Sequence, residues 1–262
     1  MTPKLMGVVN VTPDLFSDGG FFLDPEAAIT HGRELAEAGA EILDVGGEST
    51  RPGAEPVSAA EELRRVVPVI RELAGSEVRI SVDTSKAAVA VAALDAGAEI
   101  VNDVTALRGD PEMAARCAER GATVVLMHML GEPRTMQDNP RYGDVVLDVK
   151  AFLAERLETA VAAGIAEDRV WLDPGIGFGK TGAHNMELLR RFGELRELGR
   201  PLVVGTSRKS FIGGVDGSPA DQRLGGTIAS SVLAAAEGAD VLRVHDVAEM
   251  RQALAVAAAI LG

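Results

Sequence analysis

The sequence predicts an α/β fold, a single (β/α)8 TIM barrel that extends over residues 1–262 as one domain. Three observations support this prediction. The chain has 262 residues, the usual size of one such barrel. A junction recurs in which a helical pattern ends, Gly-Ala follows, and a short apolar run leads to a polar residue. Eight apolar runs in all follow one another along the chain at regular intervals.

The apolar runs predict the strands, because they lack the alternation of half-exposed strands and suit buried parallel ones. They lie at residues 4–10, 41–46, 78–83, 98–103, 122–127, 169–173, 201–206 and 239–244. Helical patterns lie between them at 25–38, 59–73, 111–120 and 145–163, and a last one covers 246–261. The glycines of the repeated junction suit the left-handed residue just past a helix end; they are Gly39, Gly97, Gly121 and Gly238. A doubly wound open sheet is the alternative, but it gives no reason for eight evenly spaced units.

Composition and charge limit the possible functions. A hydrophobic content of 47% and a charged content of 25% exclude a disordered chain. The net charge of −13 argues against binding to nucleic acid or to an anionic membrane, so a phosphate-bearing ligand needs a local cationic site. The single cysteine, Cys117, excludes an internal disulfide and suits a reducing compartment. With neither a signal-peptide pattern nor an 18-residue apolar run, we expect a cytoplasmic protein.

Each predicted strand delivers a polar side chain at its carboxyl end, where such barrels carry their chemistry. One such residue is usually a helix cap or turn former, but eight together followed by glycine-rich loops indicate a site. The glycine- and hydroxyl-rich segments 10–20 and 46–53, with Arg51, Arg243 and His245, suit phosphates. The carboxylates and amide of Asp83, Asn102 and Asp173 suit a flat heterocycle with N–H edges. Lys209 lies between the two sides.

Other chemistries are not supported. The four histidines have neither H-x-H nor H-E-x-x-H spacing, which argues against a histidine-bound catalytic zinc, and no G-x-S-x-G elbow occurs. The segment 175–180, GIGFGK, resembles a nucleotide-binding glycine loop but lacks both established spacings. For two lysines, Lys86 and Lys180, the sequence leaves two alternatives: a role in the site or a solvated position on the surface. Cys117 falls in a helical pattern and is expected to be inert.

Long motifs in order resemble the dihydropteroate synthase family, the folate-pathway enzymes that sulfonamide drugs target. They are MGVVNVTPDLFSDGG at 6–20, ILDVGGESTRPGA at 42–54, ISVDTSK at 80–86, LMHM at 126–129 with TMQ at 135–137, DPGIGFGK at 173–180, SRKS at 207–210 and RVHDV at 243–247. The resemblance covers essentially the whole chain. Leu15 and Ile176 depart from the usual Ser and Phe, which is expected to alter only loop packing.

The resemblance implies that 6-hydroxymethyl-7,8-dihydropterin diphosphate and p-aminobenzoate give 7,8-dihydropteroate and pyrophosphate. It implies a Mg2+ cofactor bound through Asn10, catalytic roles for Asp83, Lys209 and Arg51, and a homodimer formed through the apolar segments 230–236 and 253–261. The implied pterin ligands are Asp83, Asn102, Met127, Asp173 and Lys209. Thr50, Arg51, Arg243 and His245 are implied to bind the diphosphate, and Pro52, Phe178 and Ser210 the p-aminobenzoate.

Several alternatives remain at this stage. We expect dissociative substitution through a pterin methylene cation, because a well-bound pyrophosphate leaves easily and the dihydropterin ring is electron-rich; concerted displacement by the amine is the alternative. A corrinoid-linked pterin methyltransferase would share the barrel and the Asp/Asn pterin site, but would have no need of the phosphate side. A silent pterin-binding relative and a purely structural barrel are further possibilities, and pyrophosphate release would separate all three from a synthase.

Overall fold

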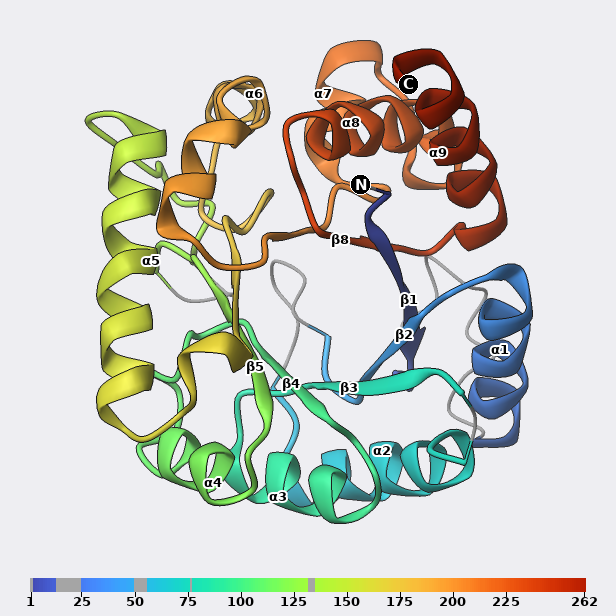
Figure 1. Ribbon diagram of the computed structural model, residues 1–262, viewed down its shortest axis with the longest axis vertical. Coiled ribbons are helices and arrows are strands. Elements are labelled where there is room, and N and C mark those ends of the chain that lie inside the picture. The colour runs from blue at the N-terminus through green and yellow to red at the C-terminus, as the bar shows by residue number, and fades with distance from the viewer. Residues whose placement is uncertain (1, 13–24, 50–55, 76, 132–134) are drawn as a thin grey trace.

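The computed structural model describes residues 2–12, 25–49, 56–75, 77–131 and 135–262. In these residues, eight parallel strands form one sheet in the order β6-β5-β4-β3-β2-β1-β8-β7, and a parallel bridge between Leu172 and Leu202 joins the β6 and β7 edges. Figure 1 shows the strands surrounded by helices. The predicted (β/α)8 barrel is confirmed, and the open doubly wound sheet is excluded. The strands are β1 (Lys4–Asn10), β2 (Ile42–Gly46), β3 (Arg79–Asp83), β4 (Ile100–Asp103), β5 (Thr123–Met127), β6 (Val170–Asp173), β7 (Val203–Val204) and β8 (Val241–Val244).

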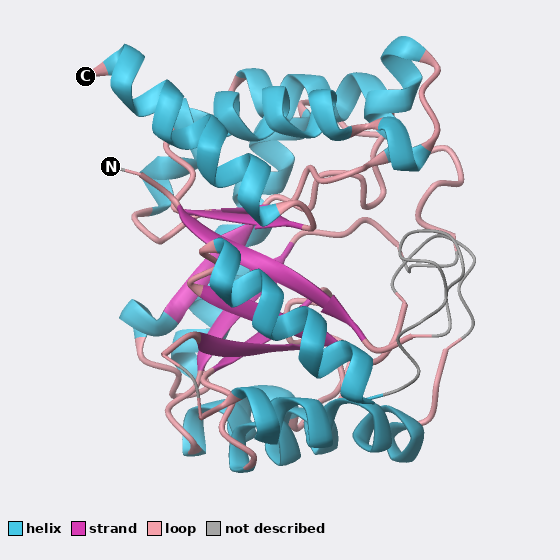
Figure 2. Cartoon of the chain, turned by 90° about the vertical axis from the view of Figure 1, so that its right-hand side faces the viewer, coloured by secondary structure: helices cyan, strands magenta, loops and turns pink. Residues whose placement is uncertain are grey.

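A helix follows each strand in the described part of the chain, with an additional α8 after α7. Figure 2 shows helices on both sides of the strands. The α-helices are α1 (Pro25–Ala38), α2 (Ala59–Leu73), α3 (Ala87–Asp95), α4 (Met113–Glu119), α5 (Val145–Ala162), α6 (Gly182–Arg190), α7 (Ser210–Asp216), α8 (Leu224–Ala236) and α9 (Val247–Leu261). Three short 3-10 helices are η1 (Glu167–Arg169), η2 (Phe192–Leu198) and η3 (Ala220–Gln222). The four junction glycines all have positive φ, between 59° and 113°, as predicted.

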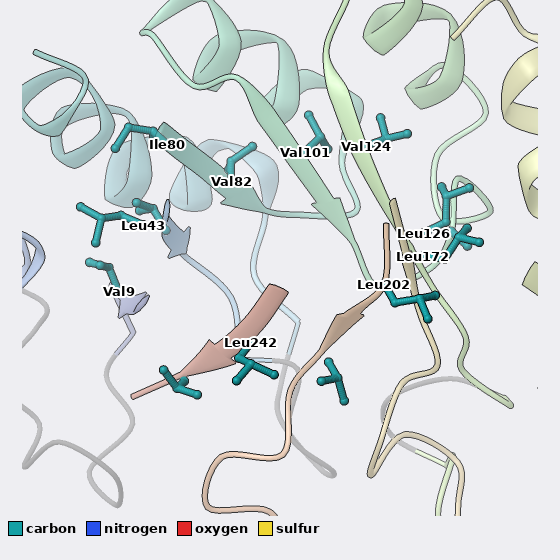
Figure 3. Close-up of a cluster of buried hydrophobic side chains, with 14 of the residues drawn as sticks. Val9, Leu43, Ile80, Val82, Val101, Val124, Leu126, Leu172, Leu202 and Leu242 are labelled. Carbon is teal, nitrogen blue, oxygen red and sulfur yellow. The ribbon is translucent and has the colours of Figure 1, made fainter. Parts of the chain in front are cut away.

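The strands carry two apolar faces. Side chains that alternate along each strand point outward and pack beneath the helices, forming the main core (Figure 3). The intervening side chains point into the barrel, where a separate buried cluster forms an apolar floor. Its members are Met6, Ile42, Ile100, Val125, Trp171, Val203 and Val241. Above this floor, toward the carboxyl ends of the strands, several of the next inward positions are polar: Asp44, Asn102, Asp173 and Arg243.

Candidate active site

A buried polar network fills the barrel directly above the apolar floor. The Asp44 carboxylate, fully buried on β2, accepts a hydrogen bond from Asn102 Nδ2 over 3.0 Å and another from Arg243 Nε over 2.6 Å. The same guanidinium donates through Nη2 to Asp83 Oδ2 over 2.8 Å. Strand register explains the assembly, because Asp83 pairs with Asn102, while β2 and β8 flank β1 on either side. The network therefore brings together predicted residues from β3, β4 and β8.

Burial changes the ionisation of Asp83. Its side chain is 8% exposed, and desolvation raises its pKa to about 7 despite the opposing charge of Arg243. The nearby Asp44, Glu62 and Asp103 carboxylates raise it further. This carboxyl group can thus change its protonation state near neutral pH, as groups in functional sites often do.

Asp173 and Lys209 form the other side of the site. Asp173 ends β6 opposite Met127 in register, is 7% exposed, and accepts a hydrogen bond from the Gly175 N–H over 2.6 Å. Lys209 donates to the carbonyl of Ile176, and its Nζ lies 4.2 Å from the centroid of the Phe178 ring. Burial lowers the pKa of Lys209 to about 8, while the Asp173 carboxylate opposes that shift.

An open cavity of about 500 Å³ lies at the carboxyl ends of the strands. Its walls include most of the predicted site residues in the described part of the chain: Asn10, Asp83, Phe178, Lys209, Ser210, Arg243 and His245. Asn102, Met127 and Asp173 do not line it; they are buried beside lining residues. Met127 packs in a small apolar cluster with Val104, Met129 and Met136, against which Phe178 lies.

Two of the predicted phosphate and carboxylate ligands occupy the rim. The imidazole of His245 is held by Ser207, whose hydroxyl lies 2.8 Å from His245 Nδ1. Ser210 is exposed at the first turn of α7. Asn10 is half-buried at the end of β1. The predicted residues Thr50, Arg51 and Pro52 lie outside the described residues, so their roles stay predictions.

Sequence reasoning did not identify several buried charges. Asp44 ends a recurring junction and resembles an ordinary strand-end residue, although its inward position could have been read from the two-residue alternation of β2. Lys86 is no solvated surface residue: it forms ion pairs with Glu48, which lines the cavity, and with the fully buried Glu62 of α2. Lys180 is 3% exposed, so a solvated position is wrong for it too.

Comparisons with known proteins agree with this geometry. A family model described as pterin binding enzyme matches residues 6–245. The dihydropteroate synthase of Escherichia coli K12 is 47% identical over 260 residues, which are 99% of this chain and 92% of that protein. The chain belongs to the dihydropteroate synthase family. Family membership confirms the predicted activity and its class, a transferase, and favours it over the corrinoid-linked methyltransferase.

Solved structures of dihydropteroate synthases have the same fold. The Yersinia pestis enzyme in a sulfonamide drug complex gives a TM-score of 0.96 at 47% identity, covering 99% of this chain and 94% of that one. The Xanthomonas albilineans enzyme with 4-aminobenzoic acid gives a TM-score of 0.92 at 50% identity, and the match covers 99% of this chain and 93% of that one. As for the membrane, none of the helices in the described ranges is long and apolar enough to cross one.

Proposed function

We propose that the cavity binds 6-hydroxymethyl-7,8-dihydropterin diphosphate at its buried base and p-aminobenzoate at its rim, and that the product is 7,8-dihydropteroate with pyrophosphate. The observation that carries this assignment is the division of the cavity between two kinds of group. The Asp83 carboxylate lines its base, with Asn102 and Asp173 buried beside lining residues, and cationic or hydroxyl groups lie around its mouth. A flat heterocycle with a charged tail matches both.

The pterin is assigned to Asp83, Asn102, Asp173 and Lys209, with Met127 on its apolar side. Ionised carboxylates accept N–H bonds from an aminopyrimidinone edge, and a lysine donates to a ring carbonyl or ring nitrogen. Arg243 supports this side as well, because it holds the carboxylates of Asp44 and Asp83. Lys209 also contacts the Phe178 ring, so the group assigned to the pterin lies next to the wall assigned to p-aminobenzoate.

The diphosphate is assigned to His245 and Arg243, together with Thr50 and Arg51. Mg2+ fits this end of the cavity: Asn10 offers one side-chain oxygen, and Mg2+ in phosphate sites commonly takes one or two protein oxygens plus phosphate oxygens and waters. No cluster of three or more His, Cys, Asp or Glu side chains in the described ranges could hold a metal by itself. When bound with the diphosphate, Mg2+ would neutralise charge on the leaving group.

Different residues stabilise the leaving group and the developing cation during the substitution. His245, positioned by Ser207, and the guanidinium groups stabilise the charge that grows on departing pyrophosphate. The carboxylates of Asp83 and Asp173 stabilise the positive charge that develops on the dihydropterin methylene group, because their hydrogen bonds to ring N–H groups strengthen as that charge appears. The aniline nitrogen then attacks, and no dedicated base is required before attack. We therefore propose dissociative substitution.

The p-aminobenzoate is assigned to the wall formed by Phe178, with Pro52 opposite and Ser210 toward its carboxylate. Phe178 and Ser210 both line the cavity. Arg223 lines it too, together with Arg208, which pairs with Asp246, and guanidinium groups suit the carboxylate of an aromatic acid.

Product analysis on the purified protein tests the proposed function. Mixing both substrates with Mg2+ should release pyrophosphate and form 7,8-dihydropteroate in equal amounts, as followed by phosphate assay and mass spectrometry. Omitting either substrate should abolish product formation. Pterin binding without turnover would identify the chain as a binding protein and overturn the proposal.

We further propose a cytoplasmic homodimer. The helices α8 and α9 expose large apolar side chains that one barrel does not cover: Leu233 is 63% exposed, Val256 55% and Ile260 77%. Covering such residues with a second copy would remove apolar surface from water. Sedimentation velocity of the wild type and of a Leu233→Glu, Ile260→Glu variant tests this, and a monomeric wild type would contradict it.

A further inference from the structure

Lys180 is a buried lysine that the proposed reaction does not use. Its side chain is 3% exposed, and its Nζ is surrounded by acceptors. The carbonyl oxygens of Gly175 and Phe178 each lie 3.0 Å away, the carbonyl of His128 lies 3.4 Å away, and His128 Nδ1 lies 2.8 Å away. Burial lowers the pKa of this lysine, and the Asp173 carboxylate opposes that shift.

The imidazole of His128 lies against the amino group of Lys180 through its Nδ1 atom. Burial, followed by the charge of Lys180, lowers the pKa of His128 to about 3, so the ring is neutral at physiological pH. The ring is also fixed from the side, because Phe152 meets it edge-on at a centroid distance of 4.8 Å. A neutral imidazole with a set orientation leaves Nδ1 available to accept from the amino group of Lys180.

The two loop carbonyls that accept from Lys180 belong to the segment between β6 and α6. Gly175, Gly177 and Gly179 in this segment have φ of 66°, 85° and 62°, a conformation that favours glycine. The segment is pressed against the chain that follows β5, since a Cβ on Gly175 would lie 1.9 Å from the His128 carbonyl oxygen. Lys180 thus satisfies carbonyls that this tight turn directs inward, away from solvent.

The other side of the same segment faces the cavity. Gly177 and Phe178 line it, the Ile176 carbonyl accepts from Lys209, and Gln137 Nε2 donates to the Gly177 carbonyl over 2.7 Å. Any movement of this segment would therefore move the Phe178 wall and one anchor of Lys209 together.

We propose that Lys180 is a positioning residue for the reaction, which holds the 175–179 segment so that Phe178 and Lys209 stay together in the cavity wall where the two substrates meet. This inference rests on the proposed function, because it takes Phe178 to be the wall of the p-aminobenzoate site. Lys180 itself is buried and does not line the cavity. Its effect passes through backbone carbonyls to the cavity wall.

Lys180→Met tests the proposal, since it keeps the length of the side chain and removes its donors. Displacing the Phe178 wall would remove contacts that bind p-aminobenzoate, and lost binding of this kind raises KM, so we expect the KM for p-aminobenzoate to rise about 10-fold or more. Calorimetry with the pterin substrate alone should show a smaller loss than that for p-aminobenzoate, because Asp83 and Asn102 do not contact the 175–179 segment, whereas Lys209 and Asp173 each lose the support of one hydrogen bond to it. The matched control is Lys150→Met, which removes a lysine that pairs with Glu197 on the outside of the barrel and should leave both constants unchanged.

Chemical rescue tests whether the lost N–H donors of Lys180, and not its lost packing or charge, cause the effect. Lys180→Ala leaves the carbonyls of Gly175 and Phe178 facing an empty space, which methylammonium can enter. Saturable recovery of p-aminobenzoate turnover with methylammonium, and none with tetramethylammonium at equal ionic strength, would support the proposal.

The possible outcomes are distinguishable from failure of the proposed function. If the wild type makes no dihydropteroate, the proposed function is wrong. If the wild type is active and Lys180→Met keeps its KM for p-aminobenzoate, the inference about Lys180 is wrong. Circular dichroism on Lys180→Met and on the milder Lys180→Gln covers the remaining case: failure of both to fold would make Lys180 a requirement of the barrel and would also overturn the inference.

Discussion

Arg243 and Asp44 lie 199 residues apart in the sequence, and their side chains meet inside the barrel, with Nε 2.6 Å from Oδ2. The same Asp44 oxygen accepts from Asn102 Nδ2 over 3.0 Å. One buried carboxylate beneath the cavity therefore fixes both an amide assigned to the pterin and a guanidinium assigned to the diphosphate. Since Asp44 is fully buried and does not line the cavity, its contribution is to orient these two groups.

Asp44→Asn should weaken pterin binding and lower stability together. Removing one partner of a buried ion pair costs about 3–5 kcal/mol when the other charge is left unpaired. Arg243 keeps its ion pair with Asp83 in this variant, so we expect a smaller loss of about 1–3 kcal/mol in the free energy of unfolding. Urea unfolding measures stability and calorimetry measures affinity. Asp95→Asn, on the surface of α3, is the control. If Asp44→Asn and Asp95→Asn had the same stability and the same pterin affinity, the orienting role of Asp44 would be wrong.

Asp173→Asn should leave the barrel folded and lose pterin affinity. A carboxylate accepts two parallel N–H bonds, whereas an amide turns one donor toward a donor. Leaving a buried donor unpaired costs about 1–3 kcal/mol, or about 5- to 150-fold in affinity. Calorimetric titration with a phosphate-free pterin measures the change. Asp168→Asn, exposed just before β6, serves as the control, and unchanged affinity in Asp173→Asn would remove Asp173 from the site.

Arg243→Ala should weaken the binding of the pterin diphosphate more than that of a pterin without phosphates. Loss of the ion pairs to Asp44 and Asp83 affects both ligands, because those carboxylates surround the pterin side. The additional loss for the diphosphate should be about 1.5–3 kcal/mol, the value of a hydrogen bond to a charged group. Parallel titrations with the two ligands measure the difference. Equal losses would mean that Arg243 only orders the carboxylates.

The strands, and the gathering of the strand-end polar residues at one rim, could be predicted because their signals are local. Buried parallel strands leave continuous apolar runs, and a barrel directs each strand's terminal polar residue to one rim. Boundaries were less accurate where helix ends compete with strands. The predicted strand at 98–103 begins only at Ile100, because the Ala98 N–H bonds back to the Ala93 carbonyl at the end of α3. The predicted strand at 201–206 is shortened to β7, and the side-chain hydroxyl of Thr206 beyond it lies 2.8 Å from the hydroxyl of Ser231.

The interactions of Asp44 and Lys180 could not be predicted in the same way. Asp44 meets Arg243 only because β1 lies between their strands, and no local pattern encodes that register. Lys180 follows Gly175, Gly177 and Gly179, and a lysine after such a glycine-rich segment is equally compatible with an exposed turn and with a buried position. Its burial depends on the packing of the 175–179 segment against His128, a contact between residues 52 positions apart. Long-range pairing of this kind becomes visible only when the barrel is closed.

The pH dependence of kcat/KM for the pterin diphosphate should be bell-shaped, with its maximum between about pH 7 and about pH 8. Burial raises the pKa of Asp83 to about 7, so below that pH the carboxyl group is protonated and loses its strength as an acceptor. Burial lowers the pKa of Lys209 to about 8, so above that pH its ammonium is lost. The rate should therefore rise with pH up to about 7 and fall above about 8, since kcat/KM reports ionisations of the free enzyme.

Steady-state kinetics from pH 5.5 to 9.5 at constant ionic strength measure this profile. Lys209→Arg is the informative variant, because a guanidinium stays charged over the whole range. It should retain the acidic limb and lose the alkaline one, whatever its effect on the maximum rate. An alkaline limb that persists unchanged in Lys209→Arg would show that another group titrates there, and the assignment of Lys209 as the cation would then be wrong.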